Sequence, residues 1–215
     1  QADQLFAMVW GQYKVWEPKG IYRNWNIGGD YYYVSDFGGN VLGHGLEANG
    51  NISFKNFWNL WTHANLNTNG ISNTMLRGGP KMRTQGGLSS GFNISSDNRK
   101  KFVFYISNFL NRGFENSSSS YSVSSGFTYK PTNTLSISFD PAFNKSSTQM
   151  QYIGLENFEN DDRYLFASLD QKVISASIRI NFNLSPDLTL QYWGQPFIAS
   201  GKFSEFKVID RPMAT

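Results

Sequence analysis

The chain has 215 residues and a mass of 24.4 kDa, which is long enough to bury a sizeable core. Aromatic residues make up 16% of it, which excludes disorder, and charged residues only 16%. The absence of cysteine excludes disulfides, thiolate metal sites and a cysteine nucleophile. The net charge of +3 is too small and too scattered to indicate nucleic-acid binding. No apolar run approaches the roughly eighteen residues of a transmembrane helix.

Apolar and polar residues alternate with a period of two from the N-terminus onward, which predicts an all-β chain. In the first half we expect strands near residues 4–16, 21–34, 46–64, 84–95 and 101–111. Short turns are expected at one end of the sheet, near residues 36–39, 96–100, 131–134 and 185–187. The opposite end is expected to carry longer loops, above all 65–83 and 112–120.

The second half contains the clearest alternation. From Tyr121 to Tyr129, tyrosine, valine and phenylalanine fall mostly on one face, and serine, glycine and threonine on the other. The strand that starts at Leu135 follows after a proline-containing turn and completes a hairpin, and Ile174 to Leu184 starts a second one. Within the segment 157–172, the stretch Arg163–Leu169 is short for a spanning strand and is expected to belong to a loop. The total is about eleven strands.

Two architectures produce such alternation: a soluble sandwich or barrel with an apolar core, and an antiparallel up-and-down transmembrane β-barrel with apolar residues facing lipid. The polar faces here carry mostly Ser, Asn, Gly, Gln and Thr rather than the Lys and Glu of a soluble sheet. Aromatic residues near strand ends, such as Trp10 and Trp16, suit a girdle at the bilayer interface. The sequence therefore favours the membrane barrel, and the soluble architecture stays open.

In a barrel, the polar face would line the lumen. The predicted lumen-facing residues are Ser122, Ser124, Ser136, Ser175, Arg179 and Asn181. The apolar stripe predicted to face lipid includes Phe127, Ile137, Ile178 and Ile180. Arg179 stands in a polar series, where a lumen would hydrate or pair it.

The candidate chemistry is thin. His44 and His63 are the only histidines and have no metal-ligand spacing, so we expect no metal and no cofactor. Carboxylates such as Asp161 and Asp162 are not placed as a glycosidase pair, and no nucleophile motif occurs. The sequence thus favours a non-catalytic role.

Two basic segments stand out, Asn98–Lys101 and Arg77–Arg83. Either could contact lipid headgroups or lipopolysaccharide, whereas the plainer interpretations are a solvated turn for the first and a structured loop for the second. Within the second, Arg77, Gly78, Gly79 and Pro80 form the best candidate for a specific role, as a folded-in loop or a partner contact, because Gly-Gly-Pro fixes a tight backbone path. A purely structural role fits equally well.

Four short segments together resemble a known family: Arg77–Pro80, Arg163–Gln171, Ser185–Leu188 and Gln195–Phe197 leading into Ser200–Lys202. Over residues 20 to 210 the chain resembles the C-terminal β-barrel domain, of unknown function, of Gram-negative outer-membrane proteins that begin with a family-nine carbohydrate-binding-like domain. The resemblance implies the bacterial outer membrane as location. It also implies the lipid bilayer, lipopolysaccharide, and other outer-membrane proteins or lipoproteins as partners.

The carbohydrate-binding-like module has no counterpart here, so glycan contact is expected only through regions outside this chain. Residues 211–215 lack the closing aromatic residue of such barrels, and residues 1–215 are expected to be a single barrel segment, incomplete at both ends. We expect a role in transport, secretion or surface glycan handling. The alternative is a soluble, secreted carbohydrate-binding module with exposed aromatic residues such as Trp193.

Overall fold

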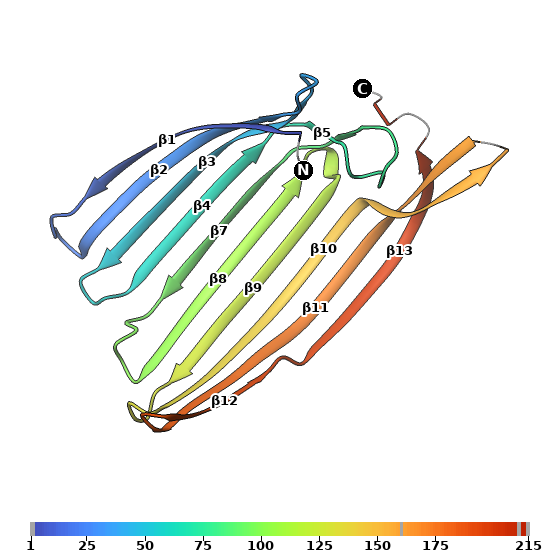
Figure 1. The fold of residues 1–215 in the computed structure, drawn as a ribbon. Coiled ribbons are helices and arrows are strands. Elements are labelled where there is room, and N and C mark those ends of the chain that lie inside the picture. The colour runs from blue at the N-terminus through green and yellow to red at the C-terminus, as the bar shows by residue number, and fades with distance from the viewer. Residues whose placement is uncertain (1–2, 160, 210–211, 214–215) are drawn as a thin grey trace.

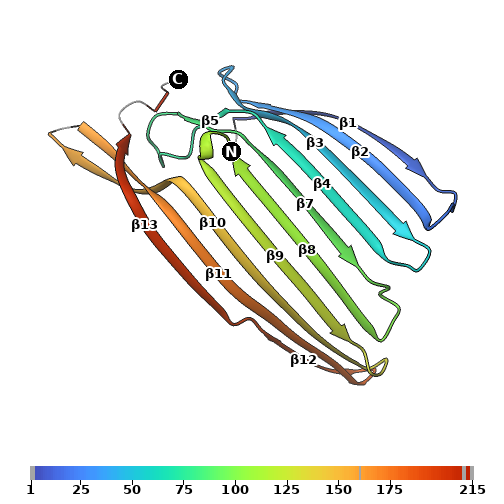
Figure 2. The same ribbon diagram turned by 180° about the vertical axis from the view of Figure 1, so that it is seen from behind.

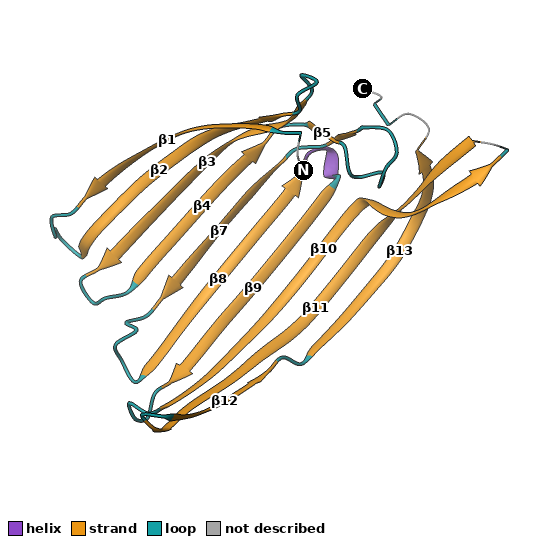
Figure 3. Ribbon diagram, in the orientation of Figure 1, coloured by secondary structure: helices purple, strands orange, loops and turns teal. Residues whose placement is uncertain are grey.

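The computed structural model describes residues 3–159, 161–209 and 212–213, and Figures 1 and 3 show strands throughout. The only helical element in these residues is one 3₁₀ turn, η1 (Phe114–Asn116). The strands are β1 (Leu5–Val15), β2 (Tyr22–Ser35), β3 (Val41–Phe54), β4 (Asn59–Asn67), β5 (Gly70–Ser72), β6 (Met82–Thr84), β7 (Gly87–Ser95), β8 (Phe102–Gly113), β9 (Ser118–Tyr129), β10 (Leu135–Phe158), β11 (Asp161–Ser185), β12 (Leu188–Gly194) and β13 (Phe197–Ile209).

Eleven strands form one antiparallel sheet in which β1 to β4 and then β7 to β12 pair in chain order, and β13 pairs with β11. The short hairpin β5–β6 is separate and lies between β4 and β7 in sequence. β12 and β13 both pair with β11 and keep the same register, so they lie end to end along one side of it. The sheet is curved and open (Figures 1 and 2), with β1 at one free edge and β12–β13 at the other. The all-β antiparallel prediction of about eleven strands is confirmed, whereas barrel closure stays a prediction.

The register divides the side chains between two faces of the sheet. One, called the polar face below, carries Asn49 of β3, His63 of β4 and Ser122 of β9, which lie in one row across the strands. The opposite one, the apolar face, carries a row through Leu46, Leu66 and Leu88. Since neighbouring residues of a strand point to opposite faces, the period-two sequence pattern becomes two chemically distinct surfaces.

Two prolines interrupt the backbone ladder at one level of the sheet. Pro141 of β10 lies opposite Ala176 of β11, and the pairing of β10 with β9 skips residues 140 and 141. On the other side of Ala176, Pro196 separates β12 from β13 and accepts a hydrogen bond from the Ala176 amide at 3.0 Å. Proline has no N–H to donate, so each removes a ladder bond at this level.

The only buried apolar cluster in the described residues lies under the β5–β6 hairpin. Leu76 and Met82 from this hairpin pack against Phe166 of β11, which is fully buried. Met150 and Tyr164 pack around them from β10 and β11. The hairpin and its loop therefore close over one end of the sheet, where β10 and β11 extend beyond β9.

The predicted strand over 46–64 is wrong, because a tight turn at residues 55–58 divides it into the ends of β3 and the start of β4. Here the Phe54 amide donates to the Trp58 carbonyl at 2.8 Å, and Phe57 adopts a positive φ of 66°. The turn contains neither glycine nor proline, so it gave no punctuation signal in the sequence.

Three further expectations need correction. Residues 161–172 are part of the 25-residue strand β11 rather than a loop, since β10 on one side and β13 on the other supply its hydrogen bonds. The segment 112–120 is not a long loop, because only residues 114–117 separate β8 from β9. The 36–39 turn lies at the same end as the 65–83 loop, since it joins β2 to β3, whereas the other short turns lie at the opposite end.

Replacing Phe166 with alanine should release the hairpin. Removing a fully buried phenylalanine typically costs about 3–5 kcal/mol, and here that loss falls on the contact with Leu76 and Met82. We expect amide hydrogen exchange in β5 and β6 to accelerate while exchange in β8 and β9 stays slow. Phe206→Ala, at a side chain 69% exposed, is the control. Unchanged exchange in the hairpin of the Phe166 variant would contradict the anchoring role.

Candidate functional site

All six residues predicted to line a lumen lie on the polar face. Ser136 of β10 is directly opposite Asn181 of β11, and Arg179 is opposite Ser138. The other three are Ser122 and Ser124 of β9 and Ser175 of β11. The four residues predicted to face lipid, Phe127, Ile137, Ile178 and Ile180, occupy the apolar face. The register thus brings each set together, and lining a lumen remains a prediction for this face.

Side chains on the polar face bond to one another across neighbouring strands. The hydroxyls of Ser107 and Ser124 are 2.8 Å apart, and those of Thr128 and Ser138 are 2.9 Å apart. Gln12 donates to the Asn26 side chain at 2.8 Å. Such pairs need no counter-charge and leave each hydroxyl free to bond to water as well. The polar face is therefore a hydroxyl- and amide-lined surface of low charge.

Arg77, Gly78, Gly79 and Pro80 lie in the loop between β5 and β6. Arg77 and Gly78 both adopt positive φ, 47° and 105°, so the glycine relieves strain that other residues would meet. The Arg77 guanidinium lies 4.9 Å from the centre of the Tyr152 ring. Gly79 approaches the Tyr164 ring so closely that any side chain would collide with it. The Arg77–Pro80 segment is thus a folded-in loop, packed against β10 and β11.

The packing of Gly79 on Tyr164 joins two of the sequence segments that stood out before. Tyr164 belongs to Arg163–Gln171, about 85 residues further along the chain. Phe166, from the same segment, forms the buried centre of the cluster under the loop. These two segments therefore form a single structural unit, which sequence reasoning found separately but did not connect.

An ion pair holds the loop from its other side. Lys81 donates to Asp36, in the β2–β3 turn, at 2.5 Å, and the Asn40 amide donates to the same carboxylate at 2.8 Å. The hydrogen bond from Lys81, followed by that from the Asn40 amide, lowers the pKa of Asp36 to about 2. Asp36 is nearly inaccessible, with a side chain 3% exposed, so the pair ties the loop firmly to the sheet. This anchor was missed because the 36–39 turn was assigned to the wrong end.

The loop covers one end of the polar face. A pocket of about 390 Å³ is lined by Met75 and Met82 from the loop region and by Ser118 and Thr148 from the polar face. A second pocket joins Thr84 and neighbouring residues to Asn67 and Asn111 of that face. The arrangement narrows the space beside the polar face at the end where the longer loop lies.

The basic turn at the opposite end is occupied by internal contacts. Arg99 donates to both carboxylate oxygens of Asp97 at 2.8 Å, and its guanidinium lies 3.2 Å from the centre of the Phe57 ring. Arg23 lies over the same ring at 4.5 Å. Arg99, within Asn98–Lys101, therefore stabilises both its own turn and the 55–58 turn. Nothing in the sequence indicated this role.

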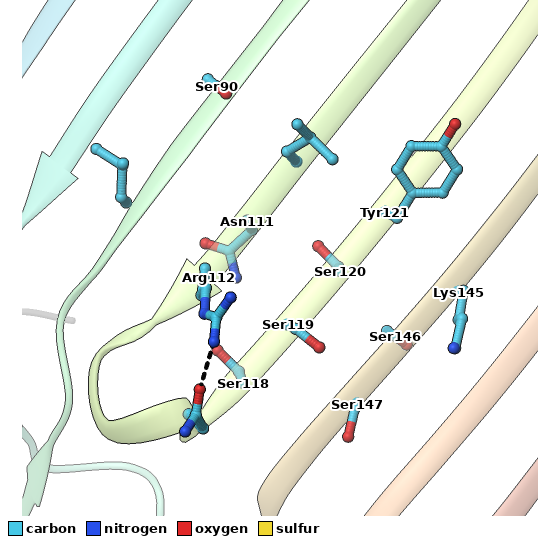
Figure 4. Close-up of a pocket in the computed structure, with 13 residues that line it drawn as sticks. Ser90, Asn111, Arg112, Ser118, Ser119, Ser120, Tyr121, Lys145, Ser146 and Ser147 are labelled. Carbon is cyan, nitrogen blue, oxygen red and sulfur yellow. Dashed lines mark hydrogen bonds between the residues drawn. The ribbon is translucent and has the colours of Figure 1, made fainter.

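A shallow pocket on the apolar face was also missed. Figure 4 shows Arg112, Tyr121 and Lys145 along it, from β8, β9 and β10, with several serines beside them. A signal was present in the sequence, because Lys145 interrupts the apolar series of Ile137, Phe139 and Phe143 on one face of β10.

No group of three or more metal-ligating side chains occurs in the residues that the structure describes. His44 lies near Tyr31 and Tyr33 on the apolar face, whereas His63 stacks on Phe109 of the polar face, so the two cannot share a ligand. No described helix is long and apolar enough to cross a bilayer.

Residues 1–211 match a domain of unknown function, DUF5916, and the chain belongs to this family. The match begins nearer the N-terminus than the resemblance in the sequence suggested. No curated protein and no solved structure matches the chain.

Acidification should detach the loop through Asp36. Its pKa is about 2 in the folded protein against about 3.9 in an unfolded chain. The contribution of the ion pair is therefore complete above about pH 4 and is lost as the pH falls towards 2. We expect pepsin to cut residues 73–81 increasingly over that range, relative to an unstructured reference peptide.

Asp36→Asn should make the same loop susceptible already at pH 4.5. Asp97→Asn is the matched control, because the pKa of Asp97 is also about 2 but its partner Arg99 is in the opposite turns. If the Asp97 variant exposed the 73–81 loop as much as the Asp36 variant, the anchor would lie elsewhere.

Proposed function

We propose that this domain forms the wall of an outer-membrane β-barrel, with the apolar face against lipid and the polar face toward an aqueous interior. Its role would be passage or scaffolding in transport, secretion or surface glycan handling rather than catalysis. Four arguments support the proposal: the accessible surface, the slope of the apolar band, the two free edges and the position of the loop.

The large accessible surface, on which many apolar side chains are exposed, carries the proposal. The solvent-accessible surface of the structure is 14283 Å², whereas that of a compact globular protein of this mass would be about 10,000 Å². Only four apolar residues are buried among those described, and many large apolar side chains are exposed. Such a surface is unstable in water but is well solvated by lipid tails.

The apolar band crosses the strands obliquely. Asn49 of β3 is in register, strand by strand, with Val173 of β11, six strands away. On β3 the apolar residues run from Leu46 to Phe54, and on β11 from Ile174 to Leu184, which displaces the band by about five residues. At about 3.3 Å per residue and 4.8 Å between strands, the strands tilt by roughly 30° from the normal to the band. Membrane barrels tilt their strands by a similar angle.

The free edges are compatible with closure. β1 runs toward the short turns and β13 runs away from them, so the two edge strands are antiparallel to each other. In a bilayer both edges must be paired, because unpaired N–H and C=O groups are costly in hydrocarbon. The pairing would come from each other or from further strands of the full-length protein.

The loop suggests how passage would be limited. In a barrel, Leu76 to Lys81 would extend over the interior at one end, since the loop covers the end of the polar face. Its attachments on both sides, to Phe166 and to Asp36, would make it a fixed constriction. Other outer-membrane proteins or lipoproteins would dock at this end, and a glycan would be bound by regions outside this chain.

Membrane fractionation of the full-length protein tests the proposal. We expect it in the outer membrane, soluble only with detergent, and migrating faster on a gel when unheated than when boiled. Recovery in plain buffer without such a shift would overturn the proposal and favour the soluble carbohydrate-binding alternative. Exposed aromatic side chains such as Trp193, 58% exposed beside Arg179, would then be screened against glycans.

Two neighbouring substitutions test which face meets lipid. Ile178→Arg places a charge on the apolar face and should reduce insertion, because arginine near the bilayer midplane costs about 2–4 kcal/mol. Ser177→Arg places the same charge on the polar face and should be tolerated. The fraction of heat-modifiable protein in the membrane measures both. Equal tolerance of the two changes would contradict the assignment of faces.

A further inference from the structure

Four basic side chains gather on the apolar face beyond the apolar band. Lys145 of β10 and Lys172 of β11 lie directly opposite each other. Arg112 lies on β8, two residues nearer to the β5–β6 loop than the row of Lys145. Lys202 of β13 is opposite Asp170 of β11. All four are exposed. With a single carboxylate among them, the cluster carries an excess of positive charge.

Among the residues that the structure describes, these lysines form no ion pair, and the carboxylate nearest to them in register is Asp170, opposite Lys202. Two ion pairs occur in the described residues, Lys81 with Asp36 and Arg99 with Asp97, and neither involves the cluster. Like charges directly opposite on neighbouring strands destabilise a sheet. An anion seated between Lys145 and Lys172 would remove this repulsion.

The surface beside the cluster is amphipathic. A pocket of about 610 Å³ contains Arg112 and Lys145, the hydroxyls of Ser119 and Ser147, and the Arg112 guanidinium is held by Asn116 at 2.8 Å (Figure 4). Its apolar part is formed by Leu88, Leu110 and the Tyr121 ring. Two residues from Lys145 and Lys172 in the direction of the short turns, Phe143 and Ile174 begin the apolar band. Cations and hydroxyls therefore border directly on a surface suited to acyl chains.

We propose that this cluster binds the phosphate of a membrane lipid headgroup while the acyl chains of that lipid lie along Phe143, Ile174 and Leu110. The inference rests on the proposed membrane location and adds a specific lipid contact to it. A guanidinium, ammonium groups and hydroxyls together donate to several phosphate oxygens. The apolar border distinguishes a lipid phosphate from free phosphate, which has nothing to place there.

Native mass spectrometry of the full-length protein in nonionic detergent tests the proposal with three probes. These are phosphatidic acid, diacylglycerol with the same chains, and inorganic phosphate, which separate the phosphate from the chains. We expect adducts with phosphatidic acid alone. The double variant Lys145→Gln, Lys172→Gln should bind it about twenty-five-fold more weakly, because each lysine near a lipid surface contributes about a fivefold factor.

The matched control is Lys100→Gln with Lys101→Gln, which removes the same charge from an exposed turn at the opposite end. It should bind phosphatidic acid as the wild type does. Equal loss in both double variants, equal binding of diacylglycerol, or equal binding of inorganic phosphate would each overturn the proposal. The gel shift of the wild-type protein, recorded in parallel, decides the membrane location separately, so a failed lipid site and a failed barrel give different results.

Discussion

The continuous antiparallel register of the sheet is the constraint on which the other features depend. Because β1 to β4 and β7 to β12 pair in chain order and β13 keeps the register of β12 on β11, a residue's parity in its own strand decides which surface it joins. A slip of one residue would move Arg179 to the surface that holds Ile178 and Ile180. The backbone hydrogen bonds between strands, rather than a packed interior, therefore keep polar and apolar side chains on separate faces.

The loop between β5 and β6 is held differently, by a small buried apolar core like that of a globular protein. Leu76, Met82 and Phe166 exclude water together, whereas Lys81 and Asp36 supply a charged attachment on the opposite side. The two attachments belong to β11 and to the β2–β3 turn, far apart in the sheet order. Both must hold for the loop to stay across the sheet, where Gly79 lies directly against the Tyr164 side chain.

Strand alternation, and with it the composition of both faces, could be predicted because it is local: the series from Tyr121 to Tyr129 specifies its own two sides. Features that depend on distant partners could not. The stretch Arg163–Leu169 is by itself short for a spanning strand, and pairing with β10 and β13 makes it part of one. The ring of Phe57, in the 55–58 turn, lies against Arg23 of β2 and Arg99 of the 96–100 turn, both distant in sequence. The pairing of Lys81 with Asp36 likewise required knowing which ends of the sheet meet.

The prolines at one level of the sheet have a mechanical consequence. The carbonyl of Pro196 points toward Ala176, so the N–H that proline lacks would also have pointed toward β11. The outer edge of β12 and β13 therefore loses no N–H donor at Pro196. Pro141 lacks its bond on the side of β9 at the same level. Backbone hydrogen bonds are therefore missing along a single line that runs from β9 across β10 and β11 to the junction of β12 and β13. Along that line the sheet offers its least resistance to bending, while the hydrogen-bonding groups of the free edge formed by β12 and β13 are kept.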